Sequence, residues 1–165
     1  MIVNTAFSGV DPAAWKILAT YRHEAPVDVV AIANMLGVKV WESLLPAGIS
    51  GKLFRDNVHG GSSGFSIIVN QPEPLVRRRF TLAHEIGHYL LHRHLFGEQV
   101  LDDTLYRSGL NSALETQAKR LAAEILIPRE LIGQLVDSGL REIGSLATKL
   151  QVSEAALKIR LGIPA

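Results

Sequence analysis

Residues 80–88 read FTLAHEIGH and contain the most informative pattern in the chain, H-E-x-x-H. Positions four apart on a helix lie one turn apart on the same face, so His84 and His88 can direct their imidazoles at one ion. Zinc binds neutral imidazole nitrogen and keeps a position open for water in catalytic sites. Glu85 stands beside the first histidine, where its carboxylate can take a proton from that water. The segment therefore predicts a zinc-dependent hydrolytic site with His84 and His88 as ligands and Glu85 as the general base.

The surroundings of the motif are those that a zinc peptidase requires. Residues 75–92 contain a single helix breaker, Gly87, and follow a turn with two prolines, so they predict one long helix. A strand is expected just before it, over residues 64–70. Apolar neighbours of the motif, including Leu82 and Ile86, would bury the site. We therefore favour a metal site over two unrelated histidines.

Two further histidines near the motif are poor candidates for the third ligand. His94 stands six residues after His88, where a longer zinc-binding pattern has its third histidine, but that pattern needs a glycine where this chain has Leu91. On a continuing helix, His94 would point about 120° away from His88. His92 lies two turns from His84, too far to share one ion. Both residues are expected to be exposed at the helix end.

Glu115 is the better candidate for the third ligand. It falls in an expected helix over residues 111–127 and lies at the edge of the apolar face of that helix, whereas Glu124 lies on the far side. Ala118 and Ala122 are small, so this helix can approach the H-E-x-x-H helix closely. A solvated carboxylate beside an apolar face is the competing interpretation of Glu115.

The loop expected at residues 97–109 carries the remaining polar candidates. Asp102 and Asp103 are alternative third ligands. Tyr106 and Arg107 are possible transition-state stabilisers, because either can donate a hydrogen bond to the oxyanion of a tetrahedral intermediate. A packed tyrosine and a surface arginine explain the same two residues equally well.

The composition describes a globular protein and excludes several classes. The 165 residues are 47% hydrophobic and 20% charged, with a formal net charge of +1 and no cysteine. A disulfide scaffold, a thiolate metal site and a cysteine nucleophile are therefore excluded. The near-neutral charge argues against direct binding of nucleic acid. Because we find neither a signal peptide nor a membrane-spanning run, we expect a cytoplasmic protein with no membrane partner.

The fold class that we predict is α+β. The expected elements are helices over 11–24 and 27–36, strands over 38–41, 49–54 and 64–70, helices over 75–92 and 111–127, and three short helices within 130–163. The strands should form a small, mostly antiparallel sheet. The edge of the strand at 64–70 is expected beside the ligand helix, where it could pair with an extended substrate. We divide the chain into an α+β domain, 1–127, and a helical C-terminal appendage, 128–165.

Two segments together resemble the ImmA/IrrE family of zinc metallo-endopeptidases: RRRFTLAHEIGHYLLH at 77–92 and ETQAKRLAAEILIP at 115–128. The resemblance implies a zincin-like metallopeptidase core. It also implies one zinc ion held by His84, His88 and Glu115, with Glu85 as the general base. Lys119 departs from the family pattern, which often has asparagine there. Similar proteins are regulatory proteases that cleave a partner repressor with a helix-turn-helix domain, so relief of transcriptional repression in a stress response is the implied function.

The last helices support a second hypothesis from another class. Residues 143–161 have a helix-turn-helix rhythm, and Lys149, Lys158 and Arg160 could contact phosphates. The chain could then be a DNA-binding or antitoxin-type regulator with a structural or vestigial metal site. Three basic residues are few for a DNA-binding surface. A purely structural metal site would also not require the proposed general base, Glu85. We therefore favour a peptidase whose C-terminal helices pack or dock a partner.

Overall fold

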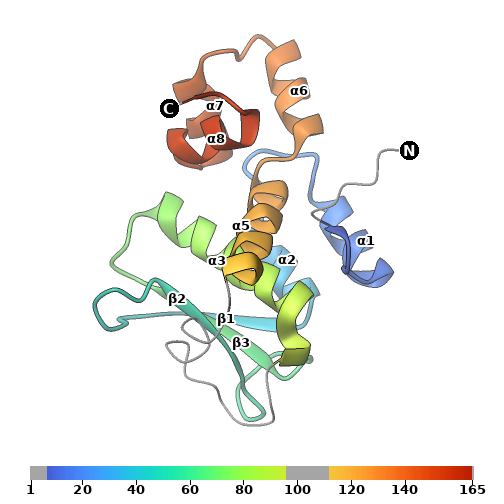
Figure 1. The fold of residues 1–165 in the computed structure, drawn as a ribbon, viewed down its shortest axis with the longest axis vertical. Coiled ribbons are helices and arrows are strands. Elements are labelled where there is room, and N and C mark those ends of the chain that lie inside the picture. The colour runs from blue at the N-terminus through green and yellow to red at the C-terminus, as the bar shows by residue number, and fades with distance from the viewer. Residues whose placement is uncertain (1–6, 96–111, 165) are drawn as a thin grey trace.

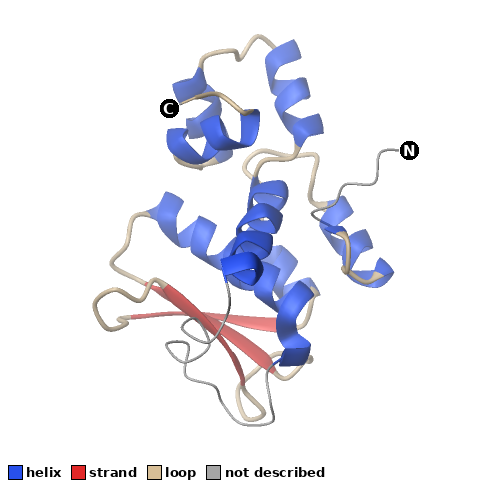
Figure 2. Cartoon of the chain, viewed as in Figure 1, coloured by secondary structure: helices blue, strands red, loops and turns tan. Residues whose placement is uncertain are grey.

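The structure is a computed structural model that describes residues 7–95 and 112–164. Its elements are helices α1 (Pro12–Thr20) and α2 (Val29–Met35), strands β1 (Val38–Ser43), β2 (Gly51–Arg55) and β3 (Phe65–Asn70), helix α3 (Leu75–His92), the 3₁₀ turn η2 (Arg93–Leu95), and helices α5 (Ser112–Leu126), α6 (Arg129–Asp137), α7 (Ile143–Leu150) and α8 (Glu154–Leu161). The strands gather at one end of the molecule, and α6 to α8 gather at the other (Figures 1 and 2). The α+β class is confirmed. Among the described helices, none has the length and apolar character needed to cross a membrane.

The sheet is mixed, and β3 is its central strand. The strand order is β1-β3-β2. β1 runs parallel to β3, with Val38 opposite Phe65, whereas β2 runs antiparallel, with Gly51 opposite Val69. Our expectation of a mostly antiparallel sheet with the 64–70 strand offering an edge is therefore wrong. Apolar alternation marks a strand but does not say which strands become its neighbours, and here β1 pairs with β3 rather than with the next strand in the chain.

Helix α3 lies across the sheet and has the bounds that the sequence predicts. Leu53 and Ile67 in the sheet are fully buried, as is Ile86 on the helix. The helix and the sheet approach one another closely at Gly51, where a Cβ atom would stand 2.5 Å from the Thr81 methyl carbon. A side chain at that position would push the helix away, so the glycine allows α3 to lie directly on the start of β2.

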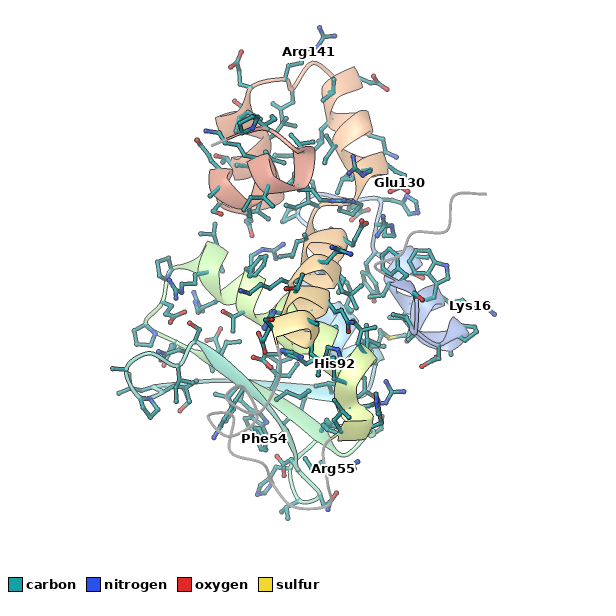
Figure 3. All side chains as sticks on the ribbon, viewed as in Figure 1. Lys16, Phe54, Arg55, His92, Glu130 and Arg141 are labelled. Carbon is teal, nitrogen blue, oxygen red and sulfur yellow. The ribbon has the colours of Figure 1, made fainter. Side chains whose placement is uncertain are left out.

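The C-terminal helices are fastened to the rest of the protein by a buried charge network, whose labelled member Glu130 is seen in Figure 3. Arg160 on α8 donates to the Glu124 carboxylate at 2.7 Å and to the Ile127 carbonyl at 3.0 Å. Arg22, which follows α1, donates to the Glu124 carbonyl at 3.1 Å and to Glu130 at 3.0 Å. The side chains of Arg22, Glu124 and Arg160 are all at most 10% exposed. Glu124 and Arg160 are the closest charged pair in this network, so removing either one would leave the other buried without its main partner.

Candidate metal centre

Helix α3 supplies two of the three side chains that meet at the candidate metal centre. His84 and His88 lie on consecutive turns, and their ring centroids are 4.6 Å apart. His84 is 7% exposed and His88 is fully buried. The one-turn spacing seen in the sequence therefore places both imidazoles on the same buried face of the helix.

Helix α5 brings Glu115 to these histidines because it crosses α3 at very short range. A Cβ atom on Gly87 would stand 2.9 Å from the Ala118 carbonyl oxygen. The crossing point is thus made of one glycine and one alanine, and Glu115 lies one helical turn before it. We expected a small residue on α5 to allow this approach, but we treated Gly87 only as a helix breaker. Its matching role on α3 follows from the packing of the two helices.

The Glu115 carboxylate bridges the two histidines. Its Oε2 atom lies 3.1 Å from His84 Nε2, and its Oε1 atom lies 3.0 Å from His88 Nε2. Ligand atoms from the three residues all fall within 4.8 Å of one another. Two ligands at ~2.0–2.1 Å from one tetrahedral ion stand about 3.3 Å apart, so the two separations between Glu115 oxygens and histidine nitrogens are close to those of a loaded site. Two imidazoles and one carboxylate also form a ligand set found in catalytic zinc sites. The residues present therefore fit a metal ion.

Glu85 is fully buried and follows His84 directly in the chain. It is not among the three residues whose ligand atoms converge. That arrangement is required of a general base, which has to remain outside the ligand set in order to exchange a proton with water.

A second layer of hydrogen bonds stands behind His88, and the sequence analysis missed it. His92, which we expected to be exposed, is only 2% exposed. Its Nδ1 atom lies 2.9 Å from His88 Nδ1, and its Nε2 atom lies 3.0 Å from Gln117 Oε1. Figure 3 labels His92 on the last part of α3, beside the first turns of α5. The expectation failed because we considered only the distance of His92 from His84 and its position at the end of the helix. Its four-residue spacing from His88 was the signal that could have found it.

These contacts, with the Gln117 amide oxygen facing His92, favour one tautomer for each neutral ring. An amide oxygen can only accept a hydrogen bond, so His92 Nε2 carries a proton and, in a neutral ring, His92 Nδ1 is an acceptor. The proton between the two rings then belongs to His88 Nδ1, which leaves the lone pair of His88 Nε2 facing Glu115. We call the set Gln117, His92 and His88 the histidine relay. It holds His88 in the tautomer and orientation that a metal ligand needs.

Of the other sequence candidates, those that the structure describes do not join the centre. His94 is exposed, as expected. Glu124 is buried in the charge network, away from the three converging residues. Asp102, Asp103, Tyr106 and Arg107 lie outside the described residues, so their predicted roles stay predictions.

A pocket of about 620 Å³ opens on the candidate metal centre, because His84 and Glu115 form part of its lining. The remaining walls come from the first half of α3, from α5, from Ser50 just before β2, and from α8 together with the turn before it. Sequence reasoning did not place the last helix beside the metal motif, since some 70 residues separate them in the chain.

A pair of imidazoles and a carboxylate that converge beside a substrate-sized pocket are typical of a metallopeptidase. The comparison with known proteins identifies the particular family. Residues 33–162 match the family described as the IrrE N-terminal-like domain, a group of peptidases. The chain belongs to this family, the ImmA/IrrE metallopeptidases, and the resemblance drawn from the sequence is confirmed.

One relative is the radiation response metalloprotease IrrE of Deinococcus radiodurans. The two sequences are 33% identical over 97 residues. The matched region covers 54% of this chain and 28% of that protein, so the chain accounts for little more than a quarter of the length of this relative.

Proposed function

We propose that the chain is a zinc-dependent endopeptidase with a zincin-like core, in which His84, His88 and Glu115 hold one zinc ion. The observation that carries this proposal is the Glu115 carboxylate, which lies 3.0 and 3.1 Å from the Nε2 atoms of the two histidines. Membership of a metallopeptidase family supports the same reaction class. Two imidazoles with one carboxylate favour zinc over the hard cations calcium and magnesium, which prefer all-oxygen ligand sets.

Glu85 is the proposed general base and acid of the reaction. When bound, zinc supplies Lewis acidity toward the scissile carbonyl and lowers the pKa of water at its open position. Glu85 removes a proton from the attacking water and then delivers it to the nitrogen of the leaving amine. His88 is kept in the ligating tautomer by the histidine relay, and its burial keeps bulk water from competing for that hydrogen bond.

The extended part of a substrate is proposed to pair with β2 rather than with β3. β3 already has a neighbour on each side, whereas β2 is the outermost described strand on its side of the sheet. The start of β2 lies directly under α3, because Gly51 meets Thr81 there. Ser50, one residue earlier, lines the pocket at the metal centre. A peptide added along β2 would therefore be carried toward the candidate ligands.

The substrate that we propose is a repressor with a helix-turn-helix domain, cleaved in the cytoplasm so that repression is relieved. This part of the proposal rests on the ImmA/IrrE resemblance and on a relative described as a radiation response metalloprotease. We further propose that residues 1–127 are the peptidase domain and 128–165 a helical region that helps to hold the substrate. The alternative, a DNA-binding or antitoxin-type regulator with a vestigial site, is not favoured by membership of a peptidase family.

The experiment compares zinc-loaded wild-type protein with Glu85→Gln, which keeps the ligands and lacks the base. Both are added to a lysate of the source cells, and new protein N-termini are mapped by mass spectrometry. We expect one or a few cleavage sites, in a helix-turn-helix protein, that are missing with Glu85→Gln. Identical N-termini from the two proteins would contradict the peptidase. Cleavage at many unrelated sites would contradict the narrow repressor specificity while leaving the peptidase in place.

A further inference from the structure

The pocket beside the metal centre is walled mainly by apolar side chains from two distant parts of the chain. Val76 and Phe80 come from α3, and Val152, Ala155 and Ile159 come from α8 and the turn before it. Ile159 is 80% exposed and Val76 is 37% exposed. Several exposed apolar side chains gathered around one hollow, rather than scattered singly, indicate a surface that an apolar group covers.

We propose that this pocket is a specificity subsite that binds a large apolar side chain of the substrate, within a residue or two of the scissile bond. This inference rests on the proposed peptidase function. The pocket is continuous with the candidate metal centre, since His84 and Glu115 are part of its lining. A peptide whose scissile bond lies at that centre must therefore place a neighbouring side chain in or over the pocket. Its volume of about 620 Å³ accommodates any natural side chain, including aromatic ones.

Positive charges around the pocket disfavour the binding of basic substrate side chains. Arg77 and Lys119 both contribute to its walls. Arg77 is held by Glu73 at 3.2 Å, and Lys119 lies on the exposed surface of α5, one turn after Glu115. Among the described residues of the lining, the one carboxylate is that of Glu115, which the proposed metal ion would engage. An arginine or lysine side chain would thus meet two like charges, whereas a leucine or phenylalanine side chain would meet apolar walls.

The wall made by α8 is anchored by hydrogen bonds and by a buried side chain. Arg79, on the ligand helix, donates to the Gln151 carbonyl at 3.3 Å and thereby ties α3 to the turn before α8. Ser153 caps α8 by accepting a hydrogen bond from the Ala156 amide at 3.0 Å. On the inner face of the helix, Leu157 is fully buried. A preformed wall binds a side chain without first being ordered, which favours selectivity for shape.

The variant that tests the subsite is Ala155→Trp. Ala155 is exposed at the start of α8 and lines the pocket, so an indole there fills the hollow without disturbing the core. Ser145→Trp is the matched control, because Ser145 is exposed on α7 and is not part of the lining. Both variants and the wild type, each loaded with zinc, are incubated with a peptide library made by digesting a proteome, and the cleaved sequences are compared.

We expect the wild type and Ser145→Trp to favour leucine, isoleucine, methionine or phenylalanine at one position near the cut and to disfavour lysine and arginine there. Ala155→Trp should cut these peptides at least tenfold more slowly and shift its preference toward glycine and alanine. A wild type without side-chain preference near the cut would overturn the subsite, as would an Ala155→Trp profile equal to that of the wild type.

A binding measurement separates the subsite from the proposed peptidase activity. N-acetyl-leucinamide and N-acetyl-lysinamide are titrated into metal-free protein while methyl resonances are followed by NMR. The leucine probe should shift the methyl signals of Val76, Ala155 and Ile159, and the lysine probe should leave them in place. Shifts from leucine without any peptide cleavage would refute the peptidase and support the pocket. No shift from leucine, or equal shifts from both probes, would overturn the subsite.

Discussion

Replacing His92 by phenylalanine tests the histidine relay most directly. Phenylalanine keeps a flat aromatic ring, slightly larger than imidazole, but has no nitrogen. The buried His88 Nδ1–H, 2.9 Å from its present acceptor, therefore loses that acceptor. A buried donor left without a partner costs about 1–3 kcal/mol. Loss of a hydrogen-bond partner behind a metal ligand typically weakens metal binding about 10- to 100-fold. We therefore expect the zinc Kd of His92→Phe to rise by that factor.

The measurement is competition for zinc with a chromophoric chelator at fixed pH, supported by NMR of the His88 ring nitrogens. His94→Phe is the matched control, because His94 is exposed two residues further along and should bind zinc as the wild type does. His92→Gln restores an acceptor and should recover part of the affinity. The reasoning fails if His92→Phe is folded, binds zinc within about threefold of the wild type, and leaves the His88 tautomer unchanged.

Four further outcomes follow from the same geometry. Alanine at any one of the three candidate ligands should remove most of the zinc found by elemental analysis, whereas His94→Ala should keep it. Glu85→Gln should retain zinc and the wild-type thermal transition but lose about 10²- to 10⁴-fold in cleavage rate, and near-wild-type cleavage would exclude it as the base. Gly87→Val should lower both Tm and zinc affinity, because its Cβ atom would stand 2.9 Å from the carbonyl oxygen of the facing helix. Arg160→Ala should cost about 3–5 kcal/mol in denaturant unfolding, since it strips a partner from the buried Glu124, and a loss below 1 kcal/mol would show that the network adds little.

The parts of the structure that the sequence predicts well are those governed by local periodicity. Helix α3 has the predicted bounds because proline precedes it and a continuous helical pattern follows. The position of Glu115 could be anticipated from the apolar face of its own helix, since its edge location follows from the helical repeat alone. The capping of α1 by Asp11 and of α8 by Ser153 is equally local.

The parts that were missed depend on which elements become neighbours. The place of β3 at the centre of the sheet depends on where β1 docks, and no side-chain alternation encodes that. Burial of His92 depends on Gln117, which arrives from another helix. Ile159 contributes to the pocket wall only because α8, far along the chain, lies beside α3 and α5 at the pocket. Each of these features arises from tertiary packing, which a single sequence leaves open.

The buried charge network has a consequence for how this sequence can change over evolutionary time. Arg22, Glu124 and Arg160 are separated by 102 and 36 positions in the chain, yet they satisfy one another in one buried place. Because a lone buried charge is far more costly than a neutral side chain, loss of Glu124 in a homologue should be accompanied by loss of Arg160, its partner at 2.7 Å. Arg22 would keep two acceptors, the backbone carbonyl at position 124 and the Glu130 carboxylate. Positions 124 and 160 should therefore vary together, although they lie in different helices and neither belongs to the metal centre.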